Sequence, residues 1–151
     1  PRPPPTHAPA PTPAPAPPPL HPSSRVTAVG ARTPRVAYNV PPDTDRLDIA
    51  DGFARRARHI HCGLGYCKAM GVRLQDRGIV QVSINMTDYT QTALYQAFEL
   101  IRIEARRYGV NVVGSEIVGL VPMAALVDTA AYYLGLEDFS AEQVLETRLE
   151  I

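Results

Sequence analysis

The chain has 151 residues, and its 15 Lys and Arg are balanced by 15 Asp and Glu, so its formal charge at pH 7 is zero. This balance argues against a nucleic acid or a membrane surface as the main partner, and no stretch has the length and hydrophobicity of a membrane-spanning helix. Two cysteines do not make a disulfide framework, so we expect a reducing, cytoplasmic setting.

The composition changes along the chain. Twelve of the sixteen prolines fall in residues 1–22, and proline has no backbone donor for a regular hydrogen-bond ladder. We therefore expect residues 1–19 to be a disordered Pro/Ala-rich segment. The aliphatic residues needed for one compact core begin near Val36, which predicts a single domain over residues 35–151.

The first predicted elements are a strand and a helix. Residues 35–40 are partly β-branched and are followed by two prolines, which favours a short strand that ends in a turn. Apolar residues then recur at helical spacing from Leu47 onward. Asp43 or Thr44 is expected to cap this helix.

A hairpin is expected next. Residues 68–75 and 79–86 are two strand-like runs separated by Asp76, Arg77 and Gly78. Glycine adopts the positive φ that a tight turn requires, so the two runs should pair antiparallel.

The C-terminal half should contain a helix over residues 92–108 that ends at Gly109, and then a strand over residues 110–120. A third helix is expected over residues 123–134. Ser140 and Gln143 have the spacing of a capping box for a last short helix.

The resulting order is βαββαβ with two added helices. This predicts an α+β, ferredoxin-like split sandwich: a four-stranded antiparallel sheet with helices on one face, followed by C-terminal helices. The other face of the sheet would be open to a ligand.

Polar residues alternate with apolar ones in the second strand of the hairpin. Ser83, Asn85 and Thr87 should lie on the open face, while the apolar residues between them pack under the helices. Such a row can hydrogen-bond a polar ligand. The competing interpretation is a half-exposed antiparallel strand whose polar side chains are only hydrated.

Glu116 is a second candidate, because a carboxylate within an apolar strand is costly unless it is paired or solvated. It is a candidate to bind an amine or imine, or to hold a proton during transfer. The competing interpretation is a structural ion pair with a nearby arginine.

Four residues with side chains that bind metals lie close together in the sequence: His59, His61, Cys62 and Cys67. Imidazole and thiolate are the usual zinc ligands. Their spacing matches no standard finger or ribbon, which favours incidental loop residues, so we assign no metal site.

Several motifs in fixed order carry a resemblance. The stretches VAYNVPPDTDRLDIA, KAMGVRLQDRGIVQVSINMTDYTQTALYQAF, RYGVNVVGSEIVGLVPMAAL and LGLEDFSAEQVLETRLE closely resemble the C-terminal subdomain of glutamate formimidoyltransferases. The resemblance runs from about Leu20 to Ile151.

The resemblance implies transfer of a formimino group from N-formimino-L-glutamate to N5 of tetrahydrofolate, the co-substrate, in histidine breakdown. Family members have two ferredoxin-like subdomains around a folate-holding tunnel, and they tend to form homodimers. The family's catalytic histidine lies in the first subdomain, in a motif HxGxHPRxGxxD with no counterpart in this sequence. No catalytic residue is therefore assigned, and the chain without the N-terminal subdomain is expected to be inactive.

The resemblance also implies that residues 20–34 are the linker between the two subdomains and that this linker contains a folate-binding segment. Arg25 stands where the family usually has glycine, and two outcomes are open. Arginine either strains a backbone that needs glycine's positive φ, or it binds the glutamate tail of folate, because guanidinium suits carboxylates. The segment consists of Leu20, His21, Pro22, Ser23, Ser24 and Arg25.

Three hypotheses stay open. In the first, the chain is one half of a formimidoyltransferase, and Ser83, Asn85 and Glu116 line the folate and substrate cavity. In the second, it is a non-catalytic folate-binding or assembly module of the same fold. The third is a zinc-stabilised adaptor built on the histidine and cysteine loop.

Overall fold

The computed structural model describes residues 29–58 and 63–149. The chain divides at Arg32, and the fold described below is that of Arg32–Ile151. The Pro/Ala-rich residues 1–19, the predicted folate-binding residues 20–25, and His59, His61 and Cys62 all lie outside the described residues.

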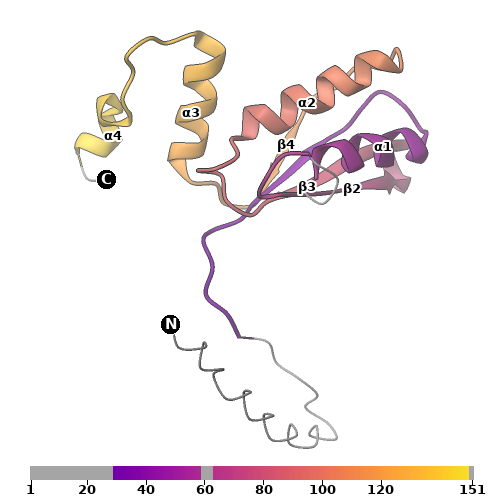
Figure 1. Cartoon of the computed structure of the whole chain (residues 1–151), viewed down its shortest axis with the longest axis horizontal. Coiled ribbons are helices and arrows are strands. Elements are labelled where there is room, and N and C mark those ends of the chain that lie inside the picture. The colour runs from indigo at the N-terminus through magenta and orange to yellow at the C-terminus, as the bar shows by residue number, and fades with distance from the viewer. Residues whose placement is uncertain (1–28, 59–62, 150–151) are drawn as a thin grey trace, which may run out of the picture. The chain divides into compact units, whose positions relative to one another are not determined.

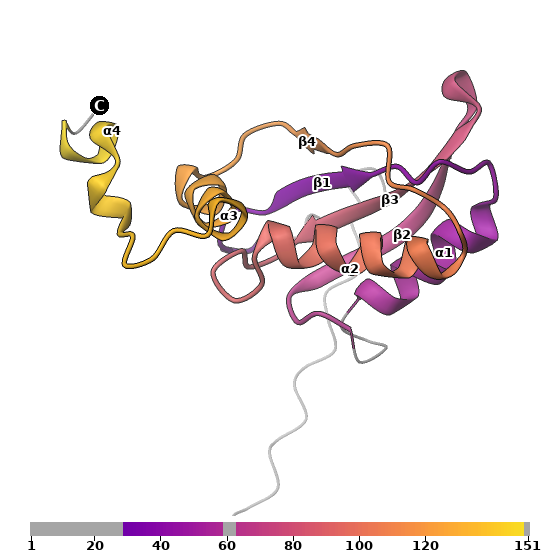
Figure 2. The ribbon, with the colours of Figure 1, turned by 90° about the horizontal axis from the view of Figure 1, so that it is seen from above.

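The described chain forms a four-stranded antiparallel sheet in the order β2-β3-β1-β4. Helices α1 and α2 lie on one side of this sheet, as Figures 1 and 2 show. The α+β, ferredoxin-like fold class is therefore confirmed. The elements in chain order are β1 (Val36–Val40), α1 (Leu47–Ala57), β2 (Cys67–Leu74), the 3-10 turn η2 (Gln75–Arg77), β3 (Ile79–Met86), α2 (Leu94–Arg107), β4 (Glu116–Val118), α3 (Met123–Leu134), the 3-10 turn η3 (Ala141–Gln143) and α4 (Leu145–Arg148).

The core lies between the sheet and the two helices. In β3 every second residue is fully buried, as the alternation of the sequence predicts, and burying each such side chain contributes about 1.5–3 kcal/mol. The helices add the apolar residues that recur at helical spacing. The main contributors are Val82, Ile84 and Met86 from β3, Ala50, Phe53 and Ala57 from α1, and Leu94, Ala97 and Ile101 from α2.

The predicted hairpin is confirmed. β2 and β3 pair antiparallel from Cys67 opposite Met86 to Leu74 opposite Ile79. The turn between them closes at Gly78, whose φ of 65° is the left-handed conformation that glycine adopts without strain. The sequence therefore fixes the register of the two strands through their turn.

The last strand is much shorter than predicted. Residues 110–120 were expected to form it, but β4 contains only Glu116–Val118. The preceding segment lies beside Pro41 and Pro42: Val113 N donates to Pro41 O at 3.0 Å, and Val112 forms an isolated bridge with Pro42. Because neither proline has an N–H group, a continuous ladder cannot form there.

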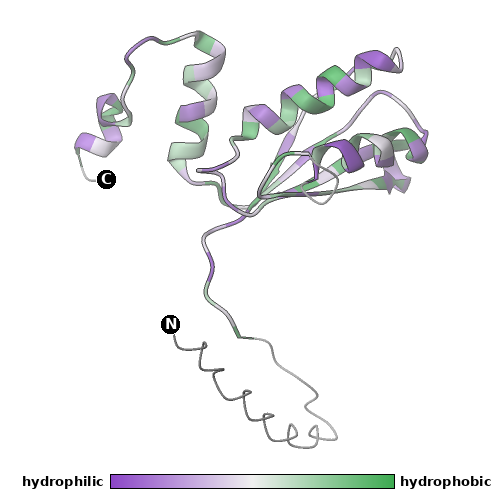
Figure 3. Ribbon diagram, viewed as in Figure 1, coloured by the Kyte–Doolittle hydropathy of each residue, from purple (hydrophilic) through white to green (hydrophobic). Residues whose placement is uncertain are grey.

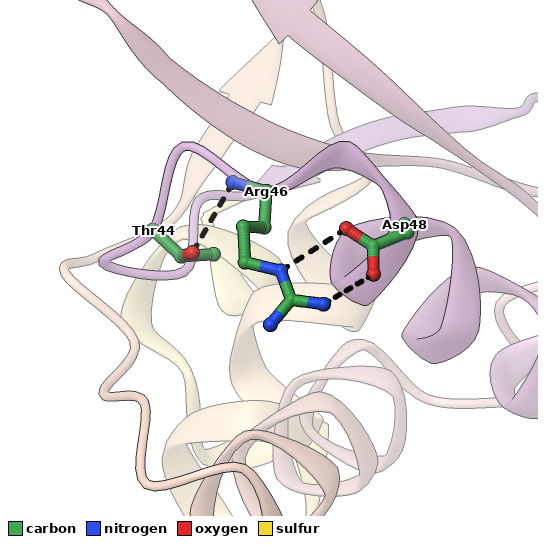
Figure 4. Close-up of polar contacts among 3 residues, drawn as sticks. All are labelled: Thr44, Arg46 and Asp48. Atoms are coloured by element: carbon green, nitrogen blue, oxygen red, sulfur yellow. Dashed lines mark hydrogen bonds and ion pairs between the residues drawn. The ribbon is translucent and has the colours of Figure 1, made fainter.

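The predicted cap of α1 is wrong. The N-cap residue is Arg46, and no side chain caps the helix. Thr44 Oγ1 instead accepts a hydrogen bond from the backbone N of the N-cap residue, Arg46, at 3.2 Å. The Arg46 guanidinium forms an ion pair with Asp48 at 2.7 Å (Figure 4). That pairing lowers the pKa of the Asp48 carboxyl, which stands in the first turn, where negative charge is favoured.

Helix α3 occupies the predicted residues, and most of them are Ala, Leu, Val or Met, which appear green in Figure 3. Of its residues only Ala125 is buried. The contacts between α3 and α2 include a ring stack and a hydrogen bond: Tyr132 stacks on Tyr95 with ring centroids 4.0 Å apart, and the Tyr133 hydroxyl donates to Glu99 at 2.7 Å.

The predicted capping box is present. Ser140 N donates to Gln143 Oε1 at 2.8 Å, and Glu142 N donates to Ser140 Oγ at 3.2 Å, at the start of η3. Across the described ranges, none of the helices has the length and apolar character needed to cross a bilayer.

Candidate functional site

The strand register brings one residue from each strand into a row across the sheet. Asn39 of β1 lies opposite Ser83 of β3 on one side and opposite Glu116 of β4 on the other. Met70 of β2 lies opposite Ser83. Residues directly opposite each other in a sheet point to the same face, so the row lies on the side away from α1 and α2, which we call the open face.

A second row on the open face lies two residues along each strand. It consists of Lys68, Asn85, Ala37 and Val118, which are paired across the sheet in that order. Lys68 and Asn85 are exposed, whereas their sequence neighbours Cys67 and Met86 are buried. The structure therefore places Ser83, Asn85 and Glu116 on one face, as the alternation predicted for the first two.

Asn39 holds the Glu116 carboxylate. Its Nδ2 donates a hydrogen bond to Glu116 Oε2 at 3.3 Å. The side-chain amide must present its NH2 group here, because an ionised carboxylate only accepts hydrogen bonds. Asn39 is 9% exposed, so it is a nearly buried polar group that supports an exposed one.

The sequence interpretation missed Asn39, although a signal was present. In VAYNV the residues Val36, Tyr38 and Val40 are buried. Applied to this strand, the alternation argument used for β3 would have placed Ala37 and Asn39 on the open face.

Glu116 does not form the structural ion pair considered above, as far as the described residues go. The ion pairs found in them are Arg46 with Asp48, Arg102 with Glu99, and Arg107 with Glu104. Glu116 is exposed and its partner is the neutral amide of Asn39. Its negative charge is therefore available to a ligand.

The two charges of the open face lie at opposite edges. Glu116 is on the β4 edge and Lys68 is on the β2 edge, with β1 and β3 between them. Three interstrand spacings separate those edges by about 14 Å. The face is therefore negative at one side and positive at the other, with Asn39, Ser83 and Asn85 between.

A cavity of about 370 Å³ adjoins the open face where β2 begins and β3 ends, and its volume is within the range of small-molecule sites. Thr87 shapes it: its N and Oγ1 both donate to Tyr66 O, at 2.7 and 2.9 Å. Thr33 Oγ1 in turn donates to Thr87 O at 3.1 Å. The lining residues are Gly65, Tyr66, Cys67, Lys68 and Thr87.

A second cavity, of about 340 Å³, lies on the helix side of the sheet. Tyr38 forms part of its wall, and burial raises the pKa of its phenol, an effect that the Ser115 hydroxyl partly offsets. Because Tyr38 and Asn39 are adjacent in β1, they point to opposite faces. The wall consists of Tyr38, Leu94, Tyr95, Phe98, Ser115, Ile117, Leu126 and Thr129.

Only one of the four residues weighed as zinc ligands is described. Cys67 is buried as a free cysteine, and burial raises the pKa of its thiol to about 11. That shift disfavours the thiolate, which is the form that binds metal. Within residues 29–58 and 63–149 no three His, Cys, Asp or Glu side chains are grouped to hold a metal ion.

Comparison with known proteins identifies relatives. The family model for the formiminotransferase domain matches residues 37–149. A glutamate formimidoyltransferase of Streptococcus pyogenes serotype M1 is 55% identical over 131 residues, which are 86% of this chain and 44% of that protein. The protein of the same name from Thermoplasma acidophilum is 45% identical over 81% of this chain and 40% of its own length.

More distant relatives are bifunctional by name. The formimidoyltransferase-cyclodeaminase of Mus musculus is 34% identical over 86% of this chain and only 25% of its own length. The chain thus spans less than half the length of the curated relatives that it matches. Apart from Val36, the match with the family model includes all four strands, and it includes both rows of the open face; we conclude that this chain belongs to the formiminotransferase domain family.

Proposed function

We propose that this chain is the C-terminal half of a glutamate formimidoyltransferase. The complete enzyme would transfer the formimino group of N-formimino-L-glutamate to N5 of tetrahydrofolate, its co-substrate, during the degradation of histidine to glutamate. The names of the two most similar relatives described above support this assignment. The cytoplasm is the expected location.

The observation that carries the proposal is the polar open face within the family match. Ser83, Asn85 and Glu116 share it with Asn39, and in the complete enzyme they would line one wall of the folate and substrate cavity. Such a wall suits a ligand with several donors and acceptors, because hydroxyl, amide and carboxylate groups provide both.

The segment Leu20, His21, Pro22, Ser23, Ser24 and Arg25 is proposed to bind folate as well. It precedes the match with the family model, which begins at residue 37. The match with the streptococcal protein covers 131 residues. Fewer residues than that follow Ala37, so this match also includes part of the chain before Ala37. That extension supports a shared linker between the two halves.

We further propose that the chain is inactive alone. The expected catalytic histidine belongs to a motif that this sequence does not contain, and the chain covers 44% of the streptococcal enzyme. An N-terminal formiminotransferase subdomain would then supply the catalytic group and the opposite wall.

Isothermal titration with tetrahydrofolate tests this function. The chain is titrated alone and then mixed with the N-terminal half of the streptococcal enzyme, and formation of 5-formiminotetrahydrofolate is followed in the mixture. We expect folate binding and formimino transfer in the mixture and no transfer by either half alone. If tetrahydrofolate does not bind even in the mixture, the proposed function is wrong.

The alternative is a non-catalytic folate-binding or assembly module of the same fold. Exposed apolar residues of the C-terminal region favour assembly: Leu120 is 96% exposed and Leu134 is 70% exposed. A homodimer or a second formiminotransferase domain would cover such residues. Sedimentation of the chain with and without the N-terminal half distinguishes these partners. A homodimer forms in the chain alone, whereas a complex with a second formiminotransferase domain forms only when that domain is added.

A further inference from the structure

The reacting group of the proposed substrate is a cation. A formimidoyl group on an amine nitrogen makes an amidine, which is protonated at neutral pH and carries N–H donors on two nitrogens in one plane. That planar pair of donors matches a carboxylate in the way that the guanidinium of arginine does. A site that selects this group therefore needs a carboxylate that is fixed in orientation and not already neutralised.

Glu116 meets the charge requirement. It is exposed on the open face, and no ion pair involving it is found among the described residues. The lysine of the same face, Lys68, lies at the opposite edge of the sheet and in the other row, so its backbone is more than about 14 Å from that of Glu116. At that separation in water, its attraction for the Glu116 charge is largely screened.

Asn39 meets the orientation requirement. β1 is paired on both sides, with β3 and with β4, so the strand that carries Asn39 is held by two neighbours. Its side chain is nearly buried and donates Nδ2 to Glu116 Oε2. One carboxylate oxygen is therefore anchored, while Oε1 and the second lone pair of Oε2 have no described partner and can accept a ligand's hydrogen bonds.

We propose that Glu116 binds the amidinium end of N-formimino-L-glutamate and that Asn39 is a positioning residue, which holds the carboxylate in the plane that this group requires. The inference rests on the proposed function and goes further by assigning two residues to the charged group of one substrate. It predicts selectivity for the cationic amidine over a neutral compound of the same shape.

The test compares two ligands that differ by one atom. N-formyl-L-glutamate has an oxygen where N-formimino-L-glutamate has a protonated nitrogen, and it is neutral at that end. Both are titrated into the whole chain, with binding followed by NMR. We expect the formimino compound to bind about tenfold more tightly, the difference that a hydrogen bond to a charged group makes.

Two variants separate charge from position. Glu116→Gln keeps the shape and removes the charge, so both ligands should bind equally. Asn39→Ala should weaken binding of the formimino compound more than binding of the formyl compound, so that the preference falls. A merely structural loss would weaken both alike. Glu146→Gln changes an exposed carboxylate of α4 and the net charge in the same way, and it should keep the preference.

The outcomes distinguish the two proposals. If the chain does not prefer the formimino compound, or if Glu116→Gln retains the preference, the inference about Glu116 is overturned. If Asn39→Ala retains the preference, its positioning role is overturned. Tetrahydrofolate is titrated separately into the chain mixed with the N-terminal half. If folate binds in that mixture but the chain lacks amidine selectivity, only this inference is overturned; if folate does not bind in the mixture, the proposed function is wrong.

Discussion

The contact between α1 and the edge strand β2 depends on the absence of a side chain at Gly71. A Cβ atom at this position would lie 2.8 Å from Asp51 N and 3.2 Å from Ala50 C, both backbone atoms of α1. Backbone cannot swing aside as a flexible side chain does, so the helix must move away from the strand. Overpacking of this kind typically costs about 1–3 kcal/mol.

We therefore expect Gly71→Ala to lower the free energy of unfolding by about 2 kcal/mol. For a domain of this size that corresponds to a decrease in Tm of roughly 6–8 °C. The Asp51 carboxylate also accepts a hydrogen bond from Gly71 N at 3.0 Å, and movement of the helix would stretch it. Urea unfolding followed by circular dichroism measures the change directly.

Gly52 provides a matched control in the same helix. A Cβ atom there would have nothing within 4 Å. Alanine is a better helix former than glycine, so Gly52→Ala should raise the free energy of unfolding by about 0.5–1 kcal/mol. The same substitution is thus expected to lower the free energy of unfolding at position 71 and to raise it at position 52. A neutral or stabilising Gly71→Ala would refute the packing argument.

Two further predictions concern titratable groups. Tyr133 is 48% exposed; partial desolvation of its hydroxyl, and then the hydrogen bond to Glu99, raise its pKa above the ordinary value of 10.0. Its contribution to stability is therefore complete below about pH 10 and is lost as the pH rises further, because the unfolded state ionises first. Stability in urea should therefore fall more steeply above pH 10 in the native chain than in Tyr133→Phe, and equal slopes would contradict this. Burial raises the pKa of Cys67 from 9.0 to about 11, so at pH 8 its thiolate is about a hundredfold scarcer than in the unfolded chain. In a Cys62→Ser background, alkylation of the folded protein should be slower than that of the urea-unfolded protein by at least this factor, and equal rates would show that Cys67 is accessible.

Local patterns predicted most of the fold because each relevant signal lies within a few residues. The alternation in β3, the glycine turn at Gly78 and the capping box at Ser140 depend only on their immediate neighbours, and the structure contains all three. The extent of β4 was wrong for the opposite reason. It depends on Pro41 and Pro42, which are distant in sequence and adjacent to residues 111–113 in space.

The candidate site was predicted only in part, for the same reason. The open-face positions of Ser83 and Asn85 follow from the pattern of their own strand. The bond between Asn39 and Glu116 joins residues 77 positions apart, and no local pattern encodes it. This hydrogen bond follows from the strand order, which places β1 between β3 and β4.

The central place of β1 has a consequence for synthesis of the protein. Of the four strands of this sheet, β1 is synthesised first, and it is paired on both sides in the finished sheet. Glu116 of β4, one of its partners, follows Asn39 by 77 positions. At the usual rate of translation that interval lasts roughly 4–15 s. Throughout it, one edge of an apolar strand is uncovered and open to pairing with other chains. Slower translation between Val40 and Glu116 should therefore increase aggregation of the nascent protein.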